Sequence, residues 1–368
     1  FANRLLGRII QLAKREKITS VADFLAARYG KSFAIASVAA IIATCGTIPY
    51  IALQLKAISA SVSLMVEHYD GALPSIEFFI GDISLLIAML LALFAVLFGT
   101  RHADATEHQN GLVLAVAIES VVKLAAFLAV GIAVTFFLFG GAGELARKVA
   151  AEPKVVNAFT HPTSLATWVV MTTLSACAII MLPRQFYVTI VENKGPDELK
   201  RAAWLFPLYL VLINLFVIPI AFAGIHAVGD RTNSDLYVLA VPLLAGHDAL
   251  ALLAFIGGLS AATAMVIVDS VALSIMISND LIIPLFVRRL LHPEGGEKED
   301  WSAVILNIRR AAIFVILFAA FLYYRESTNN ARLAAIGLIS FAAIAQFAPA
   351  FLGGLIWRGA NSRGALLG

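Results

Sequence analysis

Residues 249–286 have the sequence ALALLAFIGGLSAATAMVIVDSVALSIMISNDLIIPLF, a long apolar run that carries a carboxylate, Asp269, just past its middle. At about 1.5 Å per residue, a helix of this length exceeds the roughly 30 Å hydrocarbon core of a bilayer. One end is therefore expected to protrude from the membrane, and the polar segment 278–280 marks that end. The first half of the run predicts a tightly packed central helix, because small residues let neighbouring helix backbones approach closely in lipid. These small residues are Gly257, Gly258, Ser260, Ala261, Ala262, Thr263 and Ala264.

Asp269 is the feature of this run that points to function. A charged carboxylate inside a bilayer costs at least about 2.5–3.5 kcal/mol unless it is paired, hydrated or protonated. That cost makes Asp269 a candidate for ion or proton coupling. Two interpretations stay open from the sequence: Asp269 is a coupling group, or it belongs to an ion pair that only fixes the packing of the helices.

The composition of the whole chain is that of a multi-pass membrane protein. Hydrophobic residues make up 60% of the chain, charged residues only 14%, and the mean hydropathy is +0.88. The net charge of +3 is spread along the chain without a basic patch, so nucleic acid is not an expected partner. Cys45 and Cys177 lie in apolar runs without metal-ligand spacing, and we expect neither a metal site nor a cofactor.

Apolar segments predict eight membrane spans, at 33–62, 82–100, 110–139, 164–184, 202–225, 249–280, 303–324 and 332–357. Lys and Arg divide unevenly between the segments on the two sides of these spans. Nineteen fall in the two terminal segments and the connections on their side, and six fall in the alternate connections. Because basic residues accumulate on the cytoplasmic side, both ends are predicted to be cytoplasmic, in an all-α, multi-pass protein of the cell inner membrane.

The first 32 residues differ from the rest of the chain. Residues 1–17 have apolar positions on one side and basic positions on the other, the pattern of an amphipathic helix that lies on the membrane surface. A capping box, from Ser20 to Asp23, then predicts a short helix that ends at Gly30. We therefore predict cytoplasmic amphipathic and linker helices over 1–32 and a transmembrane domain over 33–368.

The predicted span 110–139 carries a second set of charges. Glu119 and Lys123 are spaced i,i+4 with the carboxylate first, the favourable order for a pair on one helix. Mutual neutralisation is one interpretation. The other is a shared cluster with Asp269, since both carboxylates are expected at similar depth toward the cytoplasm. Pairing alone does not separate structure from coupling.

Three spans carry features that bend a helix or add polar groups. Pro49 is expected to kink the span 33–62. Thr172 and Thr173 supply hydroxyls to the span 164–184, either for a locally unwound backbone or for the preceding helical turn. Gln346 and Pro349, among phenylalanines, suit either a gate or a kinked packing helix.

Two stretches near the N-terminus resemble a known family. The segments KITSVADFLAARYGK (17–31) and IPYIALQLKA (48–57) are similar to the sodium/solute symporter family, whose helices adopt the LeuT-type inverted-repeat fold. Three further segments resemble the symporter-like membrane module of CbrA-type sensor histidine kinases: MLPRQF (181–186), the run from RAAWLFP to NLF (201–216), and ISND (277–280).

The resemblance implies a helical bundle in which the eight spans are the third to tenth helices of a ten-helix core. The domain 33–368 is then expected to be incomplete at both ends. The span 164–184 is expected to be a broken helix that helps to build the site near the bilayer midplane. Tyr50 and Gln54 are implied to line the substrate path, together with Thr172, Thr173 and Gln346.

The sequence departs from the family at the sodium site. The two hydroxyl residues that the symporters place on the central helix align with Ala264 and Met265, which offer no side-chain oxygen to a hard cation. We therefore expect coupling to protons rather than sodium. Asp269 lies one turn from Met265, and Glu107 matches a cytoplasmic carboxylate of the family.

These observations predict secondary transport or sensing of a small polar solute, an amino acid such as histidine by the closer resemblance. Proton coupling is assigned to Asp269, Glu119, Lys123 and Glu107. The resemblance further implies a downstream kinase and a response regulator as partners. The alternatives are a stand-alone sodium/solute symporter and a receptor module that does not transport. Within this stretch we find no catalytic pattern.

Overall fold

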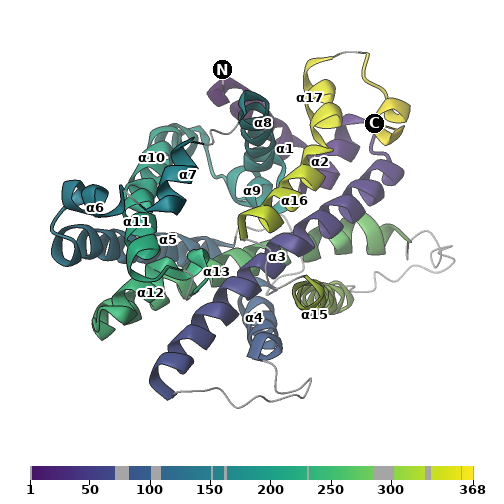
Figure 1. The fold of residues 1–368 in the computed structure, drawn as a ribbon. Helices are drawn as coiled ribbons and strands as arrows, with labels where there is room; N and C mark the ends of the chain where they lie inside the picture. Colours follow the sequence, from purple (N-terminus) through teal and green to yellow (C-terminus); the bar gives the residue numbers. More distant parts are fainter. Residues whose placement is uncertain are drawn as a thin grey trace, which may run out of the picture.

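The computed structural model describes residues 2–70, 83–100, 109–150, 152–160, 164–229, 232–285, 302–327, 333–357 and 359–367. Within these residues the regular secondary structure is helical throughout, as the sequence predicts (Figure 1). The core helices are α3 (Phe33–Asp70), α4 (Ile83–Gly99), α5 (Asn110–Ile132), α8 (Leu165–Met181), α10 (Pro196–Asn214), α11 (Val217–Ala227), α13 (Asp248–Met276), α15 (Ser302–Glu326), α16 (Leu333–Ala345) and α17 (Ala348–Ile356).

The helix α13 is the centre of the bundle, as predicted. It contacts α3, α4, α5, α12 (Tyr237–Leu244) and α15, and a π-helical turn, Ile277–Ile282, continues it (Figure 1). Its second half is almost wholly buried. The end that we expected to protrude is buried as well, since Ser278 and Asp280 are 0% and 7% exposed. This end is covered by α3, α15 and Ser20, and its protrusion from the membrane stays a prediction.

The N-terminal helices α1 (Ala2–Glu16) and α2 (Val21–Arg28) form where the sequence predicts them. Ser20 caps α2 by accepting a hydrogen bond from the Asp23 N–H at 2.9 Å, and the Thr19 N–H donates to Asp23 Oδ2 at 3.0 Å. The apolar side of α1 packs on the protein, and the place of this helix on the membrane surface stays a prediction. Ile9 and Ile10 are buried against the protein, so packing explains the amphipathic pattern.

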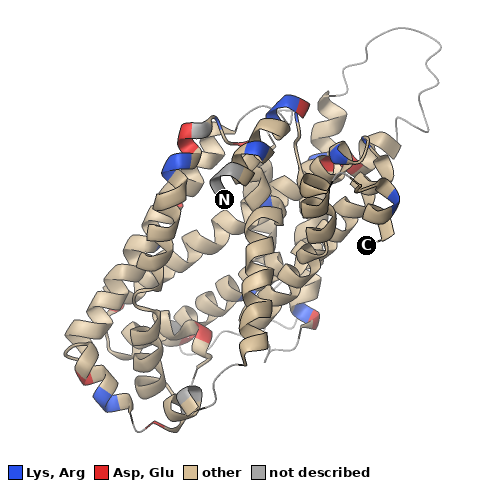
Figure 2. Ribbon diagram, turned by 90° about the horizontal axis from the view of Figure 1, so that it is seen from above, with Lys and Arg blue, Asp and Glu red and all other residues tan. Residues whose placement is uncertain are grey.

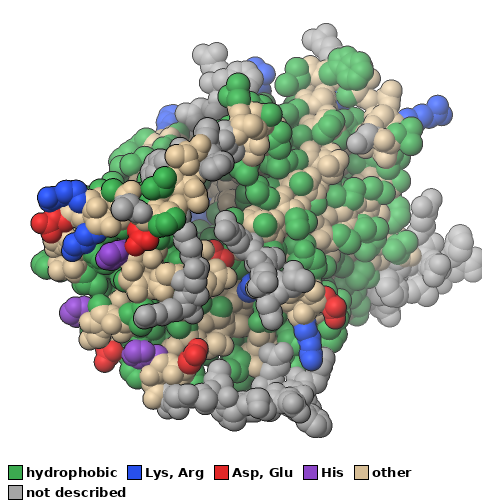
Figure 3. Space-filling view, in the orientation of Figure 1, with side chains coloured by type: hydrophobic (Ala, Val, Ile, Leu, Met, Phe, Trp, Pro, Cys, Tyr) green, Lys and Arg blue, Asp and Glu red, His purple; other side chains and the backbone are tan. Residues whose placement is uncertain are grey.

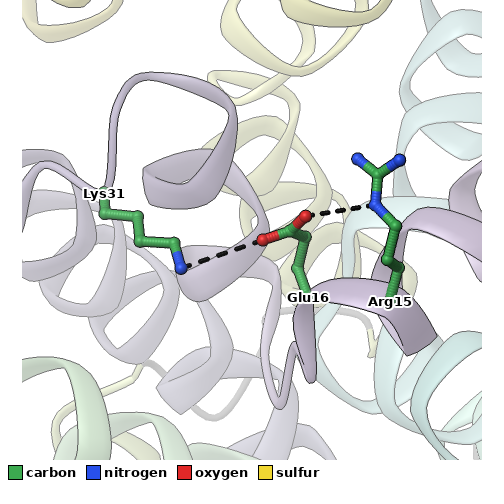
Figure 4. A network of polar contacts seen from close by, with 3 residues as sticks. All are labelled: Arg15, Glu16 and Lys31. Carbon is green, nitrogen blue, oxygen red and sulfur yellow. Dashed lines mark hydrogen bonds and ion pairs between the residues drawn. The ribbon is translucent and has the colours of Figure 1, made fainter.

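A small surface network joins the end of α1 to the turn after α2. Glu16 lies between Arg15, whose Nε is 3.2 Å from one carboxylate oxygen, and Lys31, whose Nζ is 3.8 Å from the other (Figure 4). Both cations are largely exposed, so water and salt screen these pairs and they add little stability.

Five helices of the described residues are long and apolar enough to cross a membrane: Phe33–Tyr69, Asn110–Leu138, Asp197–Ala227, Asp248–Leu285 and Ser302–Glu326. The number rises to seven when each of two bent pairs counts as one span. The helix α4 has 17 residues, fewer than the about 20 that usually cross a bilayer. All eight predicted spans therefore have a helical counterpart, but the count of eight membrane crossings stays a prediction.

The two bent pairs lie where the sequence carries a proline. The helix α8 meets α9 (Pro183–Phe186) and the π-helical turn Tyr187–Val191 at 51°, and α16 meets α17 at 40°. The second bend confirms the kink predicted from Gln346 and Pro349. The first bend lies at Leu182, at the end of α8, whereas α8 itself runs unbroken through its threonines. The helix α3 also continues through Pro49.

Short elements complete the bundle. They are the π-helical turn Ala133–Leu138 after α5, α6 (Ala142–Val149), α7 (Pro153–Thr160), the 3-10 turn Ser234–Leu236 before α12, and α18 (Ser362–Leu367).

The surface supports a membrane environment. Charged residues gather toward the two ends of the bundle (Figure 2), and hydrophobic side chains cover much of the right half of the face seen in Figure 3. Leu86, Phe98, Leu114, Trp168, Trp204 and Val315 are among many large apolar residues that are at least 49% exposed. Apolar surface on this scale is unusual for a soluble monomer but expected where lipid contacts the protein. The structure is that of a multi-pass membrane protein.

Candidate functional site

The site is built on the close contact between α5 and α13. Gly257 of α13 is buried, and a Cβ added to it would lie only 2.5 Å from the Ala126 Cβ of α5. The neighbouring Gly258 is exposed and has nothing within 4 Å of the same added atom. The small residues of the run therefore allow two long helices to approach, as predicted.

Asp269 lies within the buried second half of α13. It is fully buried, and neither of its carboxylate oxygens has a hydrogen-bond partner among the described residues. A buried polar group without a hydrogen bond is costly, and a charged one is more so. The position is therefore difficult to explain by helix packing alone.

Arg184 is the charged side chain whose electric field acts on Asp269. It belongs to α9, directly after the bend at the end of α8. Its Nη2 donates to the Tyr50 hydroxyl of α3 at 3.4 Å, and its guanidinium lies 5.5 Å from the centre of the Tyr50 ring. Asp269, Arg184 and Tyr50 thus bring α13, α9 and α3 together around one buried charge.

Met265 belongs to the same group of residues. Its Sδ accepts a hydrogen bond from the Tyr50 hydroxyl at 3.8 Å, one turn before Asp269 on α13. The position that we aligned with the sodium site of the symporters is therefore occupied by a thioether that contacts Tyr50. Ala264, beside it, offers no oxygen from its side chain. Neither side chain suits a hard cation, which binds through oxygen.

Glu119 and Lys123 do not partner Asp269. Both are partly buried on α5, where they interact electrostatically with each other, and the Lys123 Nζ lies 5.7 Å from the centre of the Tyr209 ring. Lys123 does lie within the field of Arg184, a charge of the same sign. The shared cluster of Asp269 with Glu119 and Lys123 is therefore wrong, because the cation that acts on Asp269 is Arg184 of α9 and not Lys123.

The other predicted residues are distributed over several helices. Gln54 is buried on α3, one turn after Tyr50. Thr172 and Thr173 are exposed on α8, and the Thr173 hydroxyl bonds the Val169 carbonyl of the preceding turn at 2.8 Å. Gln346 is exposed at the bend and donates to the Ala342 carbonyl. Glu107 lies outside the described residues.

Sequence reasoning missed Arg184, although the signal was present. The segment MLPRQF places an arginine directly after a proline at the end of an apolar span. We counted Arg184 with the basic residues of a cytoplasmic connection, and the bend at Leu182 instead directs it into the bundle. A proline that ends an apolar run and is followed by a cation is the pattern to examine.

A second polar group joins the far end of α13 to α2 and α15. The Ser20 hydroxyl donates to Asp280 Oδ2 at 2.6 Å, and Asn279 contacts Thr19 at 3.4 Å and Arg309 at 3.3 Å. Burial raises the pKa of Asp23 in α2 above its ordinary value, while the Thr19 N–H and Lys31 act in the opposite direction. This group holds the end of the central helix in place.

Comparison with known proteins gives relatives of one kind. No family model matches the chain. The chain is 23% identical over 232 residues, 63% of its length, to the uncharacterized symporter YhjB of Bacillus subtilis (strain 168). It is 20% identical over 366 residues, 99% of its length, to the uncharacterized symporter YodF of the same organism. It spans 43% of the first relative and 67% of the second.

One solved structure is similar over 97% of this chain and 70% of its own, with a TM-score of 0.55 and 14% sequence identity. It is the substrate-bound outward-open state of a Na+-coupled sialic acid symporter. The chain has a symporter-like fold. This confirms the broader resemblance that we drew from the sequence. The narrower one, to the membrane modules of sensor kinases, has no support from these relatives and stays a prediction.

Proposed function

We propose that this chain belongs to a secondary transporter that moves a small polar solute across the cell inner membrane and couples that movement to protons at Asp269. The symporter-like fold and the symporter relatives support solute transport. Asp269 supports the coupling, because it is fully buried, its oxygens have no hydrogen-bond partner within the part of the chain that the structure describes, and it interacts with a cation on a different helix. That combination is the observation that carries the proposal.

The coupling step follows from the charges. Ionised Asp269 attracts Arg184, and in a poorly hydrated interior this attraction is much stronger than in water. It holds α9, and with it the bend at the end of α8, against α13. Proton binding makes Asp269 neutral and removes the attraction, while the Tyr50 hydroxyl still accepts from Arg184. The bent pair is then free to change its angle to α13, and the loss of the proton restores the first arrangement.

The residues beside this charge support protons over sodium as the coupling ion. Ala264 and Met265 give no side-chain oxygen, and the Met265 sulfur is in contact with Tyr50. The structural neighbour is a Na+-coupled symporter, so sodium is the alternative that must be tested. For the solute, we propose an amino acid such as histidine, following the closer sequence resemblance.

Uptake into proteoliposomes tests the proposal. The full-length protein is reconstituted, and a panel of labelled amino acids that starts with histidine is offered under an imposed pH gradient or an imposed sodium gradient. We expect at least one solute to accumulate with the pH gradient when sodium is absent. Saturable sodium dependence at a clamped pH would overturn the proton coupling. Binding without flux would favour a receptor module in place of a transporter.

A further inference from the structure

Three buried phenylalanine rings meet where three helices converge. Phe24 belongs to α2, Phe186 to α9 and Phe351 to α17, and each side chain is at most 1% exposed. The rings of Phe24 and Phe351 are stacked, with centroids 4.7 Å apart and planes inclined at 29°. The Phe186 ring lies edge-on to both, at 5.7 Å and 61° from Phe24 and at 6.5 Å and 90° from Phe351. Stacked and edge-on pairs are favourable arrangements of aromatic rings, so this cluster stabilises the contact of α9 with α2 and α17.

The helices α2 and α17 are bonded to each other. The Tyr29 hydroxyl, at the end of α2, donates to the Ala350 carbonyl of α17 at 2.8 Å, and Arg28 donates to the Gly354 carbonyl. A Cβ added to Gly354 would lie 2.9 Å from the Arg28 Cγ, so the two helices also pack closely. They therefore form one unit.

This unit is anchored to the central helix. The Ser20 hydroxyl, which caps α2, donates to Asp280 in the turn that continues α13, and α2 also contacts α3. Phe24 and Phe351 are thus held in place by contacts on several sides. We call these two rings the aromatic socket, and Phe186 is the ring of α9 that occupies it.

The helix α9 carries both the ring in the aromatic socket and the cation that acts on Asp269. Arg184 and Phe186 are two residues apart in a helix of only four residues, Pro183–Phe186. Because protein interiors are close-packed and transmit strain, so short a helix shifts as one body. Movement of Arg184 away from Asp269 therefore displaces Phe186 within the aromatic socket.

We propose that Phe24 and Phe351 are positioning residues for Arg184 that set how readily α9 leaves Asp269, a role that rests on the proposed proton coupling. Ionised Asp269 and the filled aromatic socket both hold α9 against α13. Protonated Asp269 leaves the aromatic socket and the hydrogen bond to Tyr50 to hold it. A weaker socket favours the released arrangement. Since proton binding also favours release, the midpoint of release then moves to higher pH.

The titratable groups that interact with Asp269 lie on α9 and α3. They are Arg184 and Tyr50, which also interact with each other. On α5, Lys123 interacts with Arg184 and with Glu119. The helix α4 has no titratable residue, and the buried arginine of α15 bonds the far end of the central helix. The aromatic socket adds no charge to this group, so a change in its rings leaves the titrating groups in place.

The distance between two spin labels reports the position of the bent pair without any solute. The labels are attached to cysteines that replace Trp168 on α8 and Leu252 on α13, which are 62% and 51% exposed. Cys45 and Cys177 are changed to alanine in the full-length protein. Pulsed electron paramagnetic resonance in nanodiscs then gives the populations of the two arrangements as the pH is lowered from mildly alkaline to mildly acidic. We expect the distance to change with pH in the parent, and Asp269→Asn to hold it at its low-pH value.

Leucine at either position of the aromatic socket keeps the site apolar but removes a ring. Phe24→Leu and Phe351→Leu are each expected to raise the pH midpoint of the distance change by about 0.5–1 unit, which is about a three- to tenfold shift toward the released arrangement. Phe321→Leu is the matched control, because Phe321 on α15 is equally buried and contacts Phe318 outside the aromatic socket. It should leave the midpoint at the parent value.

An unchanged midpoint in both socket variants, or an equal shift in Phe321→Leu, would overturn the role of the aromatic socket. These results leave the proton coupling intact, because the parent still responds to pH. If the distance ignores pH but the socket variants change it, the aromatic socket stands and the proton coupling fails. If neither pH nor the socket variants change the distance, both proposals fail.

Discussion

The contact between α5 and α13 can be tested with two adjacent glycines. In a helix, Gly→Ala gains about 1 kcal/mol of intrinsic helix stability. At Gly258 the added Cβ meets nothing within 4 Å, so Gly258→Ala should stabilise the protein by up to that amount. At Gly257 the same atom would lie 2.5 Å from the Ala126 Cβ, and such overpacking typically costs about 1–3 kcal/mol. The difference between the two variants isolates the overpacking energy.

Unfolding titrated with sodium dodecyl sulfate in mixed micelles measures this difference. We expect Gly257→Ala to be less stable than Gly258→Ala by about 1–3 kcal/mol. The double variant Ala126→Gly/Gly257→Ala removes the clashing methyl group, so that the Lys123 Cα, at 3.8 Å, becomes the nearest neighbour of the new Cβ. It should return close to the parent. Equal stability of the two single variants, or no rescue in the double variant, would refute the close helix contact.

Three further predictions concern the cap of α2, the Tyr50 hydroxyl and the orientation of the bundle in the membrane. Ser20→Ala removes the cap of α2 and a hydrogen bond to the buried carboxylate of Asp280, so unfolding titrations should show a free energy of unfolding lower by about 2–4 kcal/mol. Ser20→Thr keeps the hydroxyl and should largely avoid this loss. Tyr50→Phe removes the oxygen that accepts a hydrogen bond from Arg184 but keeps the aromatic ring, so it should change the pH profile of uptake more than the affinity for solute. An unchanged pH profile would argue against a role for the Tyr50 hydroxyl in coupling. A cysteine that replaces Lys148 should react with a thiol reagent that cannot cross the membrane when it is added outside the cell. A cysteine that replaces Lys200 should react only with a thiol reagent that crosses the membrane. The opposite labelling pattern would reverse the predicted topology.

Much of the fold follows from local patterns in the sequence. The capping box at Ser20, the small-residue first half of α13 and the proline-linked bend near Gln346 all act over a few residues, so spacing alone identifies them. The length of the central run also predicts a central helix. Each of these features is decided by neighbours along the chain.

The partners of buried charges were less predictable, because they depend on how distant segments pack. Arg184 reaches Asp269 through the bend after α8, and Asp280 is buried because α3, α15 and Ser20 cover the end of the central helix. Helical spacing pointed instead to Lys123, which the structure places on the wall of a cavity. Contacts between segments far apart in sequence decided all three outcomes.

The role of Asp269 can be measured with a solute that the parent protein accumulates. Asp269→Asn keeps the size of the side chain and its capacity to accept hydrogen bonds but cannot take up or release a proton. Asp280→Asn is the matched control, since Asp280 is also buried, in the π-helical turn that continues α13, but it accepts a hydrogen bond from Ser20 and does not interact with Arg184.

Proteoliposomes containing each variant are compared in two assays: exchange of labelled solute without a gradient, and accumulation driven by a pH gradient. We predict that Asp269→Asn exchanges solute but does not accumulate it, and that Asp280→Asn does both. If Asp269→Asn accumulates solute as well as the parent, with the same pH profile, then Asp269 does not carry the coupled proton.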